Sequence, residues 1–372
     1  MRAVGIILAG GNNHKMRELS NKRAIAAMPV AGSFRSIDFA LSNMTNSGIQ
    51  KVAVLTQYNA RSLNEHLSSS KWWDFGRKQG GLYVFTPTIT VGNNFWYRGT
   101  ADSIAQNIDF LKRCHEPYVV IASGDGVYKL DYNKVLEYHI NKKADITIVS
   151  ANVPEGDDAT RFGVMETNAD GRVLSFQEKP LATTGRKVST GIYVIRRRPL
   201  IELIEKAVSE DRYDFVNDIL VRYKDLKRIY EYPIETYWSS ISTVDAYYRT
   251  NMDFLKPEVR DYFFRQYPDV YSKIEDMPPA KYNPGANVKN SLISTGCIIN
   301  GTVENSILFR KVFVGEGCVI RNSIILNDVY IGNDSHIENC IVESRDTIHP
   351  NAEYVGEDGI KIVVENSERY II

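Results

Sequence analysis

The sequence predicts an α/β domain with a mostly parallel mixed sheet, followed by a parallel β-helix. Two observations support this prediction. Apolar strand-like runs alternate with helix-like segments over residues 1–250, and aliphatic residues recur about every six positions from residue 283 onward. Strands that are apolar throughout and separated by helices are typical of a sheet covered on both faces. The 372 residues of the chain suffice for two such domains.

Each element of the first domain follows from its pattern of apolar residues. Unbroken apolar runs predict strands, and apolar residues on one helical face predict helices. Residues 163–166 and 172–176 are expected to pair as a hairpin. Ligands of such sheets bind beyond the carboxyl ends of the strands, where loops 10–16 and 124–128 are expected to lie. The expected strands are 3–8, 51–56, 118–122 and 146–151, and the expected helices are 34–45, 60–67, 101–111 and 132–140.

The second domain is predicted from its repeat. Short aliphatic strands separated by Gly, Asn and Ser match hexapeptide β-helix repeats, in which stacked coils share one core. An ordinary antiparallel β domain is the alternative. The preceding segment is rich in proline and aromatic residues, which indicates a linker carrying one short helix. The expected boundaries are therefore 1–255 for the α/β domain, 256–282 for the linker and 283–372 for the β-helix.

The composition excludes several classes of protein. Lys plus Arg and Asp plus Glu both number 45, so the formal net charge is zero. This balance argues against a basic nucleic-acid-binding protein and against an acidic disordered chain. The four cysteines form no C-x-x-C pair, which favours reduced thiols. No apolar run approaches the ~18 residues of a membrane span, so we expect a cytoplasmic protein.

Two short motifs lie where expected strands end. Gly10 and Gly11 follow the first strand, and their missing side chains would let backbone N–H groups approach a phosphate or a base. A plain turn is the alternative there. Asp125 follows another strand and suits a Mg²⁺ ion, which takes one or two carboxylates together with phosphates. A capping or turn aspartate is the alternative at that position.

Two further motifs carry polar groups with a weaker signal. Glu178 could hold sugar hydroxyls and Lys179 a phosphate, although such a pair is common on protein surfaces. Thr100 is expected to be the N-cap of a helix whose N–H groups point toward a ligand. The six histidines show no metal-ligand spacing.

Taken together, the motifs of this chain resemble one family. They agree in order and spacing with sugar-nucleotide pyrophosphorylases and, more narrowly, with glucose-1-phosphate adenylyltransferase, also called ADP-glucose pyrophosphorylase. The matching segments are Ile-Leu-Ala-Gly-Gly at 7–11, Ser-Ile-Asp-Phe-Ala-Leu-Ser-Asn at 36–43, Asn-Ser-Gly-Ile at 46–49, Trp-Tyr-Arg-Gly-Thr-Ala-Asp at 96–102, Ser-Gly-Asp at 123–125, Phe-Gly-Val-Met at 162–165, Glu-Lys-Pro at 178–180 and Gly-Ile-Tyr-Val at 191–194.

The resemblance implies a nucleotide-diphospho-sugar transferase domain followed by a left-handed β-helix. It also implies the reaction of ATP with glucose 1-phosphate to give ADP-glucose and pyrophosphate, with Mg²⁺, in glycogen synthesis. Asp125 would be a Mg²⁺ ligand. The nucleotide side would contain Gly10, Gly11, Tyr97, Gly99 and Thr100. The glucose-1-phosphate side would contain Gly163, Glu178, Lys179, Ser189, Tyr193, Asp214 and Trp238.

The chain departs from the family pattern on the triphosphate and metal side. Asn13 replaces a flexible glycine, Lys15 replaces an arginine and Ile25 replaces a lysine. Ser240 stands where the family has its second Mg²⁺-binding aspartate. Lysine cannot reproduce a bidentate guanidinium contact. Because the loss of one preorganised contact costs ~10²–10³ in rate, we expect Asp125 to belong to a degraded catalytic site that holds Mg²⁺ weakly or not at all.

This pattern resembles the GlgD-type subunit of the family, which pairs with a catalytic sister and modulates it. We therefore expect a regulatory subunit with little activity alone, in a hetero-tetramer with a catalytic subunit or in an oligomer of its own. Sugar phosphates or other anions are the expected effectors. The candidate cationic contacts for them are Lys22, Arg23, Arg35 and residues 196–198, although a solvated helix start explains the run 196–198 at least as well.

Two other functions stay open. A fully competent adenylyltransferase would need Lys15 and another carboxylate, such as Asp218 or Asp245, in place of the missing groups. A β-helix acyltransferase would need a catalytic base, for which His336 and His349 are the candidates.

Overall fold

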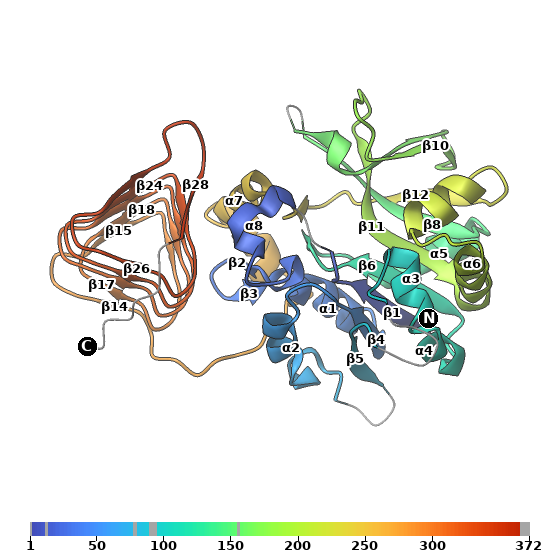
Figure 1. The fold of residues 1–372 in the computed structure, drawn as a ribbon, viewed down its shortest axis with the longest axis horizontal. Helices are drawn as coiled ribbons and strands as arrows, with labels where there is room; N and C mark the ends of the chain where they lie inside the picture. Colours follow the sequence, from blue (N-terminus) through green and yellow to red (C-terminus); the bar gives the residue numbers. More distant parts are fainter. Residues whose placement is uncertain (1, 12–13, 77–79, 89–94, 155–156, 365–372) are drawn as a thin grey trace. The chain divides into compact units, whose positions relative to one another are not determined.

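The computed structural model describes residues 2–11, 14–76, 80–88, 95–154 and 157–364 (Figure 1). The chain forms two compact units, Met1–Gly11 with Phe39–Trp238 and Asn12–Asp38 with Ser239–Ile372. The second unit thus contains an N-terminal segment as well as the C-terminal part of the chain. The reason is that the segment 12–38 hydrogen-bonds to elements of the C-terminal part of the chain.

The first unit is built on a mixed sheet, which contains nine strands within the described residues. The main path of the sheet is β10-β9-β11-β6-β1-β4-β5, and β8 pairs with both β11 and β12. Strands β6, β1, β4 and β5 are parallel neighbours, whereas β11 runs antiparallel to β6, β8 and β9. The strands are β1 (Ala3–Leu8), β4 (Lys51–Leu55), β5 (Gly81–Phe85), β6 (Tyr118–Ser123), β8 (Ile146–Asn152), β9 (Gly163–Thr167), β10 (Val173–Glu178), β11 (Lys187–Arg196) and β12 (Ile229–Pro233).

Helices cover both faces of this sheet (Figure 1). Ile6 on one face of β1 belongs to a buried cluster with Leu111 and Leu203. Gly5 on the opposite face lies so near Met44 that a Cβ atom there would be 2.9 Å from its sulfur. The α-helices of this part are α1 (Ser36–Asn46), α2 (Arg61–Leu67), α3 (Thr100–Ala105), α4 (Ile108–Arg113), α5 (Tyr132–Asn141) and α6 (Arg197–Ser209), with shorter turns η3 (Ser70–Trp73), η4 (Ala159–Arg161) and η5 (Val216–Val221).

The expected single helix over 101–111 is wrong, because α3 and α4 are separate helices. The break lies at Asn107, whose φ of −115° and ψ of 22° are not helical. The Asn107 side chain donates hydrogen bonds to the Ser103 carbonyl at 2.8 Å and to the Tyr97 hydroxyl at 2.9 Å. Apolar periodicity continues across the break, so the pattern alone could not reveal it.

The expected hairpin is confirmed, with β9 and β10 antiparallel. Its turn is closed by Gly171 N–H, which donates to the Asn168 carbonyl at 3.0 Å. The Asn168 side chain also accepts from Arg172 N–H at 2.8 Å. This hairpin carries Gly163 and Glu178 at its open end, where the two residues are paired.

The second unit joins an N-terminal segment to two helices. Tyr247 of α7 donates to the Pro29 carbonyl at 2.7 Å, and Ala31 N–H donates to the Asn251 side chain at 3.0 Å. The Phe34 ring stacks on Phe264 of α8. The elements are η1 (His14–Ser20), η2 (Ile25–Ala27), β2 (Pro29–Val30), β3 (Phe34–Arg35), α7 (Val244–Asp253) and α8 (Pro257–Phe264), of which α8 lies in the expected linker.

The C-terminal part is a left-handed parallel β-helix, as expected. Strands three apart in the chain pair in parallel, which gives three sheets and one strand of each sheet per coil. The inward side chains form one apolar core that includes Val303, Ile320 and Ile337. The first sheet holds β14 (Lys281–Tyr282), β17 (Ile298–Ile299), β20 (Phe313–Val314), β23 (Tyr330–Ile331) and β26 (Thr347–Ile348). The second holds β15 (Asn287–Lys289), β18 (Thr302–Glu304), β21 (Val319–Arg321), β24 (His336–Glu338) and β27 (Glu353–Val355). The third holds β16 (Leu292–Ile293), β19 (Ile307–Leu308), β22 (Ile324–Ile325), β25 (Cys340–Val342) and β28 (Lys361–Val363).

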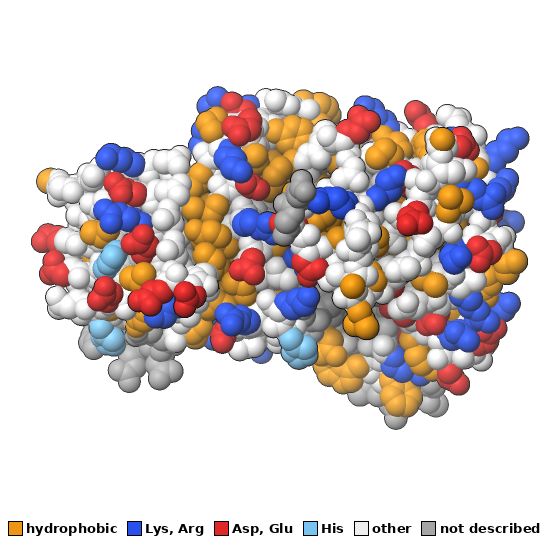
Figure 2. Space-filling view, turned by 90° about the horizontal axis from the view of Figure 1, so that it is seen from above, with side chains coloured by type: hydrophobic (Ala, Val, Ile, Leu, Met, Phe, Trp, Pro, Cys, Tyr) orange, Lys and Arg blue, Asp and Glu red, His pale blue; other side chains and the backbone are white. Residues whose placement is uncertain are grey.

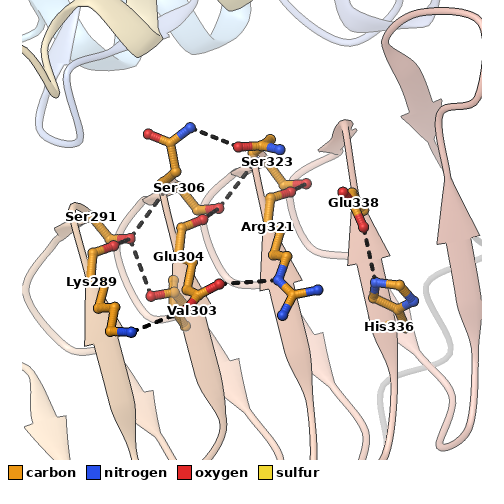
Figure 3. A network of polar contacts seen from close by, with 11 residues as sticks. Lys289, Ser291, Val303, Glu304, Ser306, Arg321, Ser323, His336 and Glu338 are labelled. Atoms are coloured by element: carbon orange, nitrogen blue, oxygen red, sulfur yellow. Dashed lines mark hydrogen bonds and ion pairs between the residues drawn. The ribbon is translucent and has the colours of Figure 1, made fainter.

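The second sheet carries a ladder of alternating charge on its outer side (Figure 3). Glu304 contacts both Lys289 and Arg321, at 3.8 Å and 3.1 Å. His336 lies next along the sheet, with Glu338 at 3.2 Å and Glu353 at 4.0 Å, and these contacts are ion pairs only when His336 is protonated. Pairs this exposed stabilise a fold by only ~0–1 kcal/mol each. Their regular alternation instead avoids like charges on neighbouring coils.

A different ion pair is buried within the second unit. Arg23 forms a salt bridge with Glu343, whose side chain is 1% exposed.

Two other candidate effector contacts also interact with the protein itself. Burial lowers the pKa of Arg35, and the Asp38 carboxylate opposes this shift. In the first unit, Arg197 donates to the carbonyls of Glu116 and Leu111 at 2.8 Å and 3.1 Å. Arg23 and Arg197, two of the candidate effector contacts, therefore have internal partners.

The surface carries charges of both signs. On the face that Figure 2 shows, Lys and Arg side chains are interspersed with Asp and Glu, in keeping with the zero net charge. Among the residues that the structure describes, no helix is long and apolar enough to cross a membrane.

Candidate functional site

The expected nucleotide side lies at the carboxyl ends of β1, β4 and β6. Ala9 N–H donates to the Leu55 carbonyl at 2.8 Å, and Gly124 N–H donates to the Leu8 carbonyl at 3.0 Å. These bonds hold the three strand ends side by side. A Cβ atom on Gly11 would meet nothing within 4 Å, so the backbone there is open to a ligand. The expected contribution of Asn13 to this loop lies outside the described residues.

Gln57 joins this edge of the sheet to Tyr97. The Tyr97 N–H donates to the Gln57 side-chain oxygen at 2.6 Å, and the Gln57 amide donates back to the Tyr97 carbonyl at 3.3 Å. A Cβ atom on Gly10 would lie 3.5 Å from Gln57 Cβ, so Gln57 also flanks the glycine pair. Burial raises the pKa of Tyr97, while the bond from Asn107 opposes this shift.

Sequence reasoning missed Gln57 and Asn107 as parts of the site. One signal was available for Gln57, because it follows the strand 51–55 directly and therefore had to lie at the ligand-binding edge. No comparable signal existed for Asn107. Its role depends on the break between α3 and α4.

Asp125 lies at the end of β6 as expected, and its carboxylate accepts a hydrogen bond from Ser123. Within the described part of the chain, no three His, Cys, Asp or Glu side chains come together in a group that could hold a metal ion. The resemblance implies a second carboxylate ligand at position 240, where this chain has a serine, so Asp125 is the one carboxylate of the expected pair that remains. We therefore assign no step to a bound metal in this chain.

The expected sugar side is assembled around Glu178, on β10. Burial raises the pKa of Glu178, Lys179 opposes this shift, and the nearby Asp214 carboxylate adds to it. Burial also raises the pKa of Tyr193, and Glu178 and Asp214 contribute through their charge. Ser189 and Tyr193 share a hydrogen bond of 3.2 Å between their hydroxyls. Ser189 and Tyr193 on β11 are therefore in contact, and Glu178 on β10 and Asp214 in the segment before η5 lie within electrostatic range of Tyr193.

Gly163 and Lys179 shape the edge of this cluster. A Cβ atom on Gly163 would clash with the Phe176 ring and lie 2.8 Å from a Glu178 carboxylate oxygen. Glycine therefore makes room for the Glu178 carboxylate. The Lys179 ammonium lies 3.6 Å from Glu178, with 68% of its side chain exposed. An exposed ammonium beside a recessed carboxylate suits a ligand that carries both a phosphate and hydroxyl groups.

Trp238 contributes an unused donor to the first unit. Its ring packs against Phe162, with 5.4 Å between centroids. Its indole N–H is buried and has no hydrogen-bond partner among the residues that the structure describes. Buried polar groups are almost always paired, so this N–H is an exception.

The expectation that Thr100 is the N-cap of a helix is wrong. Gly99 is the N-cap of α3, and Thr100 is the first residue of the helix. The Tyr213 carbonyl accepts hydrogen bonds from Ala101 N–H and Asp102 N–H at 2.8 Å and 3.2 Å. These N–H groups at the helix start therefore bind the protein's own backbone and do not point toward a ligand.

The three described replacements all lie in the second unit. Lys15 is exposed in η1, whereas the Ile25 side chain is only 8% exposed in η2. Ser240 is 6% exposed, and its hydroxyl donates to Ser242 at 3.2 Å. A polar hydroxyl and an aliphatic side chain therefore occupy the positions for which the resemblance implied an aspartate and a lysine.

The two histidines considered as catalytic bases of an acyltransferase do not lie in a buried site. His336 belongs to the charge ladder of the second sheet, next to Glu338 on the same strand (Figure 3), and its other ring nitrogen lies 4.0 Å from Glu353. His349 is an exposed residue that follows β26. Neither histidine is buried, so neither has the shielding that usually tunes a catalytic base.

Comparisons with known proteins agree with this architecture. The family model of nucleotidyl transferases matches residues 4–257, and the model of the GlmU-like C-terminal hexapeptide region matches residues 278–362. Relatives named glucose-1-phosphate adenylyltransferase occur in Thermosipho melanesiensis, Geobacillus stearothermophilus and Clostridium novyi. The identities are 41%, 38% and 38%, over 86%, 86% and 85% of this chain and 77%, 83% and 84% of the respective relative. With the sheet, the β-helix and the clustered sugar-side residues in place, the chain belongs to the glucose-1-phosphate adenylyltransferase family.

Proposed function

We propose that this chain is a regulatory subunit of glucose-1-phosphate adenylyltransferase, with weak or no catalysis of its own. It binds glucose 1-phosphate through its first unit and pairs with a catalytic sister in a cytoplasmic hetero-tetramer. In that complex the sister joins ATP to glucose 1-phosphate, which yields ADP-glucose and pyrophosphate for glycogen synthesis. The relatives cited above carry the name of the enzyme itself.

One contrast between the two sides of the site supports the proposal. On the sugar side, Ser189 and Tyr193 share a hydrogen bond, Glu178 and Asp214 lie within electrostatic range of Tyr193, and Lys179 is exposed beside Glu178. On the triphosphate side, Ile25 and Ser240 carry no charge at positions where the family pattern has a lysine and an aspartate. A phosphorus centre under attack needs cations that are already in place, and this chain supplies fewer of them.

The charged side chains that this chain keeps suffice to bind glucose 1-phosphate but not to catalyse the transfer. Binding a monophosphate ester needs one cation and several hydrogen-bonding groups, which Lys179, Glu178 and Ser189 supply. Transfer of the adenylyl group also needs the leaving pyrophosphate to be oriented and neutralised. Lys15 offers only a point charge for this task, and Ser240 supplies no carboxylate for a metal ion.

An assay with the catalytic sister tests this proposal. The pure chain, incubated with ATP, Mg²⁺ and glucose 1-phosphate, is expected to form ADP-glucose at less than about 1% of the sister's rate, since one lost contact alone costs ~10²–10³. A tagged copy is expected to retain the sister on a column and to change its dependence on glucose 1-phosphate. Turnover by the pure chain at a rate similar to the sister's would refute the regulatory role.

A further inference from the structure

The segment 97–102 is joined to the segment 211–218 by more contacts than a helix start requires. The Thr100 hydroxyl accepts a hydrogen bond from Phe215 N–H at 2.8 Å, and its own proton faces an Asp214 carboxylate oxygen at 3.5 Å. Thr100 is thus bonded to the backbone immediately after Asp214. The Thr100 hydroxyl makes no capping hydrogen bond to α3. It is therefore free to bond the segment 214–215.

Gly99 permits this close approach of the two segments. A Cβ atom there would lie 2.8 Å from the carbonyl carbon of Tyr213. The Tyr213 carbonyl in turn accepts from Ala101 N–H and Asp102 N–H. The two backbones therefore meet without an intervening side chain, and the position of residues 213–215 follows the start of α3.

Arg98 adds a second link on the outer side. Its guanidinium carbon lies 3.7 Å from the centre of the Tyr213 ring and one nitrogen donates to the Tyr213 hydroxyl at 2.7 Å. The same guanidinium forms a salt bridge at 3.0 Å with Asp102, which is 1% exposed. Asp102 thereby fixes Arg98 against Tyr213.

Asp214 depends on these links for its direction. One of its carboxylate oxygens accepts from Asn217 N–H at 2.7 Å, and its own N–H donates to Asp218 at 2.9 Å. The Asp214 charge raises the pKa of both Glu178 and Tyr193, so these two side chains lie within electrostatic range of its carboxylate. A shift of the backbone at 214–215 would move this carboxylate relative to the other three side chains.

We propose that Thr100 is a positioning residue that holds the backbone at Asp214 and Phe215 and thereby orients the Asp214 carboxylate toward a bound sugar phosphate. This inference rests on the proposed binding of glucose 1-phosphate. Asp214 itself is the group expected to touch the sugar, and Thr100 acts through it. The start of α3 on the expected nucleotide side thus shapes the sugar side of the same unit.

Calorimetric titration of the full chain with glucose 1-phosphate tests this role. The variant Thr100→Val keeps the size of the side chain but removes the acceptor for Phe215 N–H, and we expect about tenfold weaker binding. Thr100→Ser keeps the hydroxyl and is expected to restore the affinity. The matched control is Thr147→Val, since Thr147 is buried and bonds His139 at 2.9 Å in the interior of the same unit.

The outcomes distinguish the positioning role of Thr100 from the proposed binding of glucose 1-phosphate. Equal loss of thermal stability in both valine variants, with weaker binding only in Thr100→Val, supports the positioning role. Wild-type binding retained by Thr100→Val overturns it while leaving the proposed function intact. A wild-type chain that binds no glucose 1-phosphate overturns both. If Thr100→Val does not fold, Thr100→Ala, which also removes the acceptor for Phe215 N–H, replaces it, and unchanged affinity in that variant also overturns the inference.

Discussion

Restoring the replaced side chains is expected to raise ADP-glucose formation by the pure chain about 10²-fold or more. The variant combines Lys15→Arg, Ile25→Lys and Ser240→Asp. Each substitution returns a group that would orient or neutralise the polyphosphate of ATP, and one such contact is typically worth ~10²–10³ in rate. The three effects will not multiply, because residues of one site act together. The measurement is initial rate with saturating ATP, Mg²⁺ and glucose 1-phosphate.

The burial of Ile25 affects the design of this experiment. Ile25 is only 8% exposed, so a lysine there has to bury its stem or displace its neighbours, which lowers stability. The double variant Lys15→Arg with Ser240→Asp therefore accompanies the triple variant. Both are compared with the wild-type chain for thermal unfolding, and rates are read only where the protein is folded.

A matched control separates a restored ligand from a merely added charge. Ser239 precedes Ser240 on β13 (Trp238–Ser240), and successive side chains of a strand point to opposite faces. Ser239→Asp adds the same carboxylate to the opposite face and is expected to leave the rate at the wild-type level. If the folded triple and double variants gain nothing over this control, the loss of catalysis does not lie in these three positions.

Substitution of Lys179 is expected to weaken glucose 1-phosphate binding by about 10- to 100-fold. Lys179→Gln removes the charge beside Glu178 while keeping a polar side chain of similar length. A hydrogen bond to a charged group contributes ~1.5–3 kcal/mol, and ~1.4 kcal/mol corresponds to a factor of ten. Isothermal titration calorimetry of the folded variant measures the loss.

The chain offers a closely matched control for this substitution. Lys143 has a left-handed backbone like Lys179, with φ of 49° against 45°, so both glutamine variants carry the same conformational cost. Lys143→Gln is expected to bind glucose 1-phosphate as the wild type does. Equal affinity of the two variants would show that Lys179 makes no contact with the phosphate.

Much of the fold could be predicted from apolar periodicity. The strands at 3–8 and 51–55 and the repeat after residue 283 are dictated by which residues must be buried. The membership of segment 12–38 in the second unit could not be predicted in this way. It depends on hydrogen bonds such as Tyr247 to Pro29, between residues 218 positions apart, which leave no periodic signal.

The candidate site was predictable to a lesser degree. Family motifs located Glu178, Tyr193 and Asp214, and the structure brings these side chains within electrostatic range of one another. The capping role of Thr100 was wrong because a local helix signal competes with a tertiary contact, the bond from Phe215 N–H. Gln57 was missed because an isolated glutamine has no characteristic spacing, although its place after a strand was a usable signal.

The most direct test of the whole account compares two ligands on the wild-type chain. Calorimetry with glucose 1-phosphate and with ATP, each with and without Mg²⁺, measures what the two sides of the site retain. We predict saturable binding of glucose 1-phosphate, together with weak ATP binding that Mg²⁺ does not tighten. Strong binding of ATP that depends on Mg²⁺ would contradict the account, since it would require a polyphosphate and metal site that these residues do not provide.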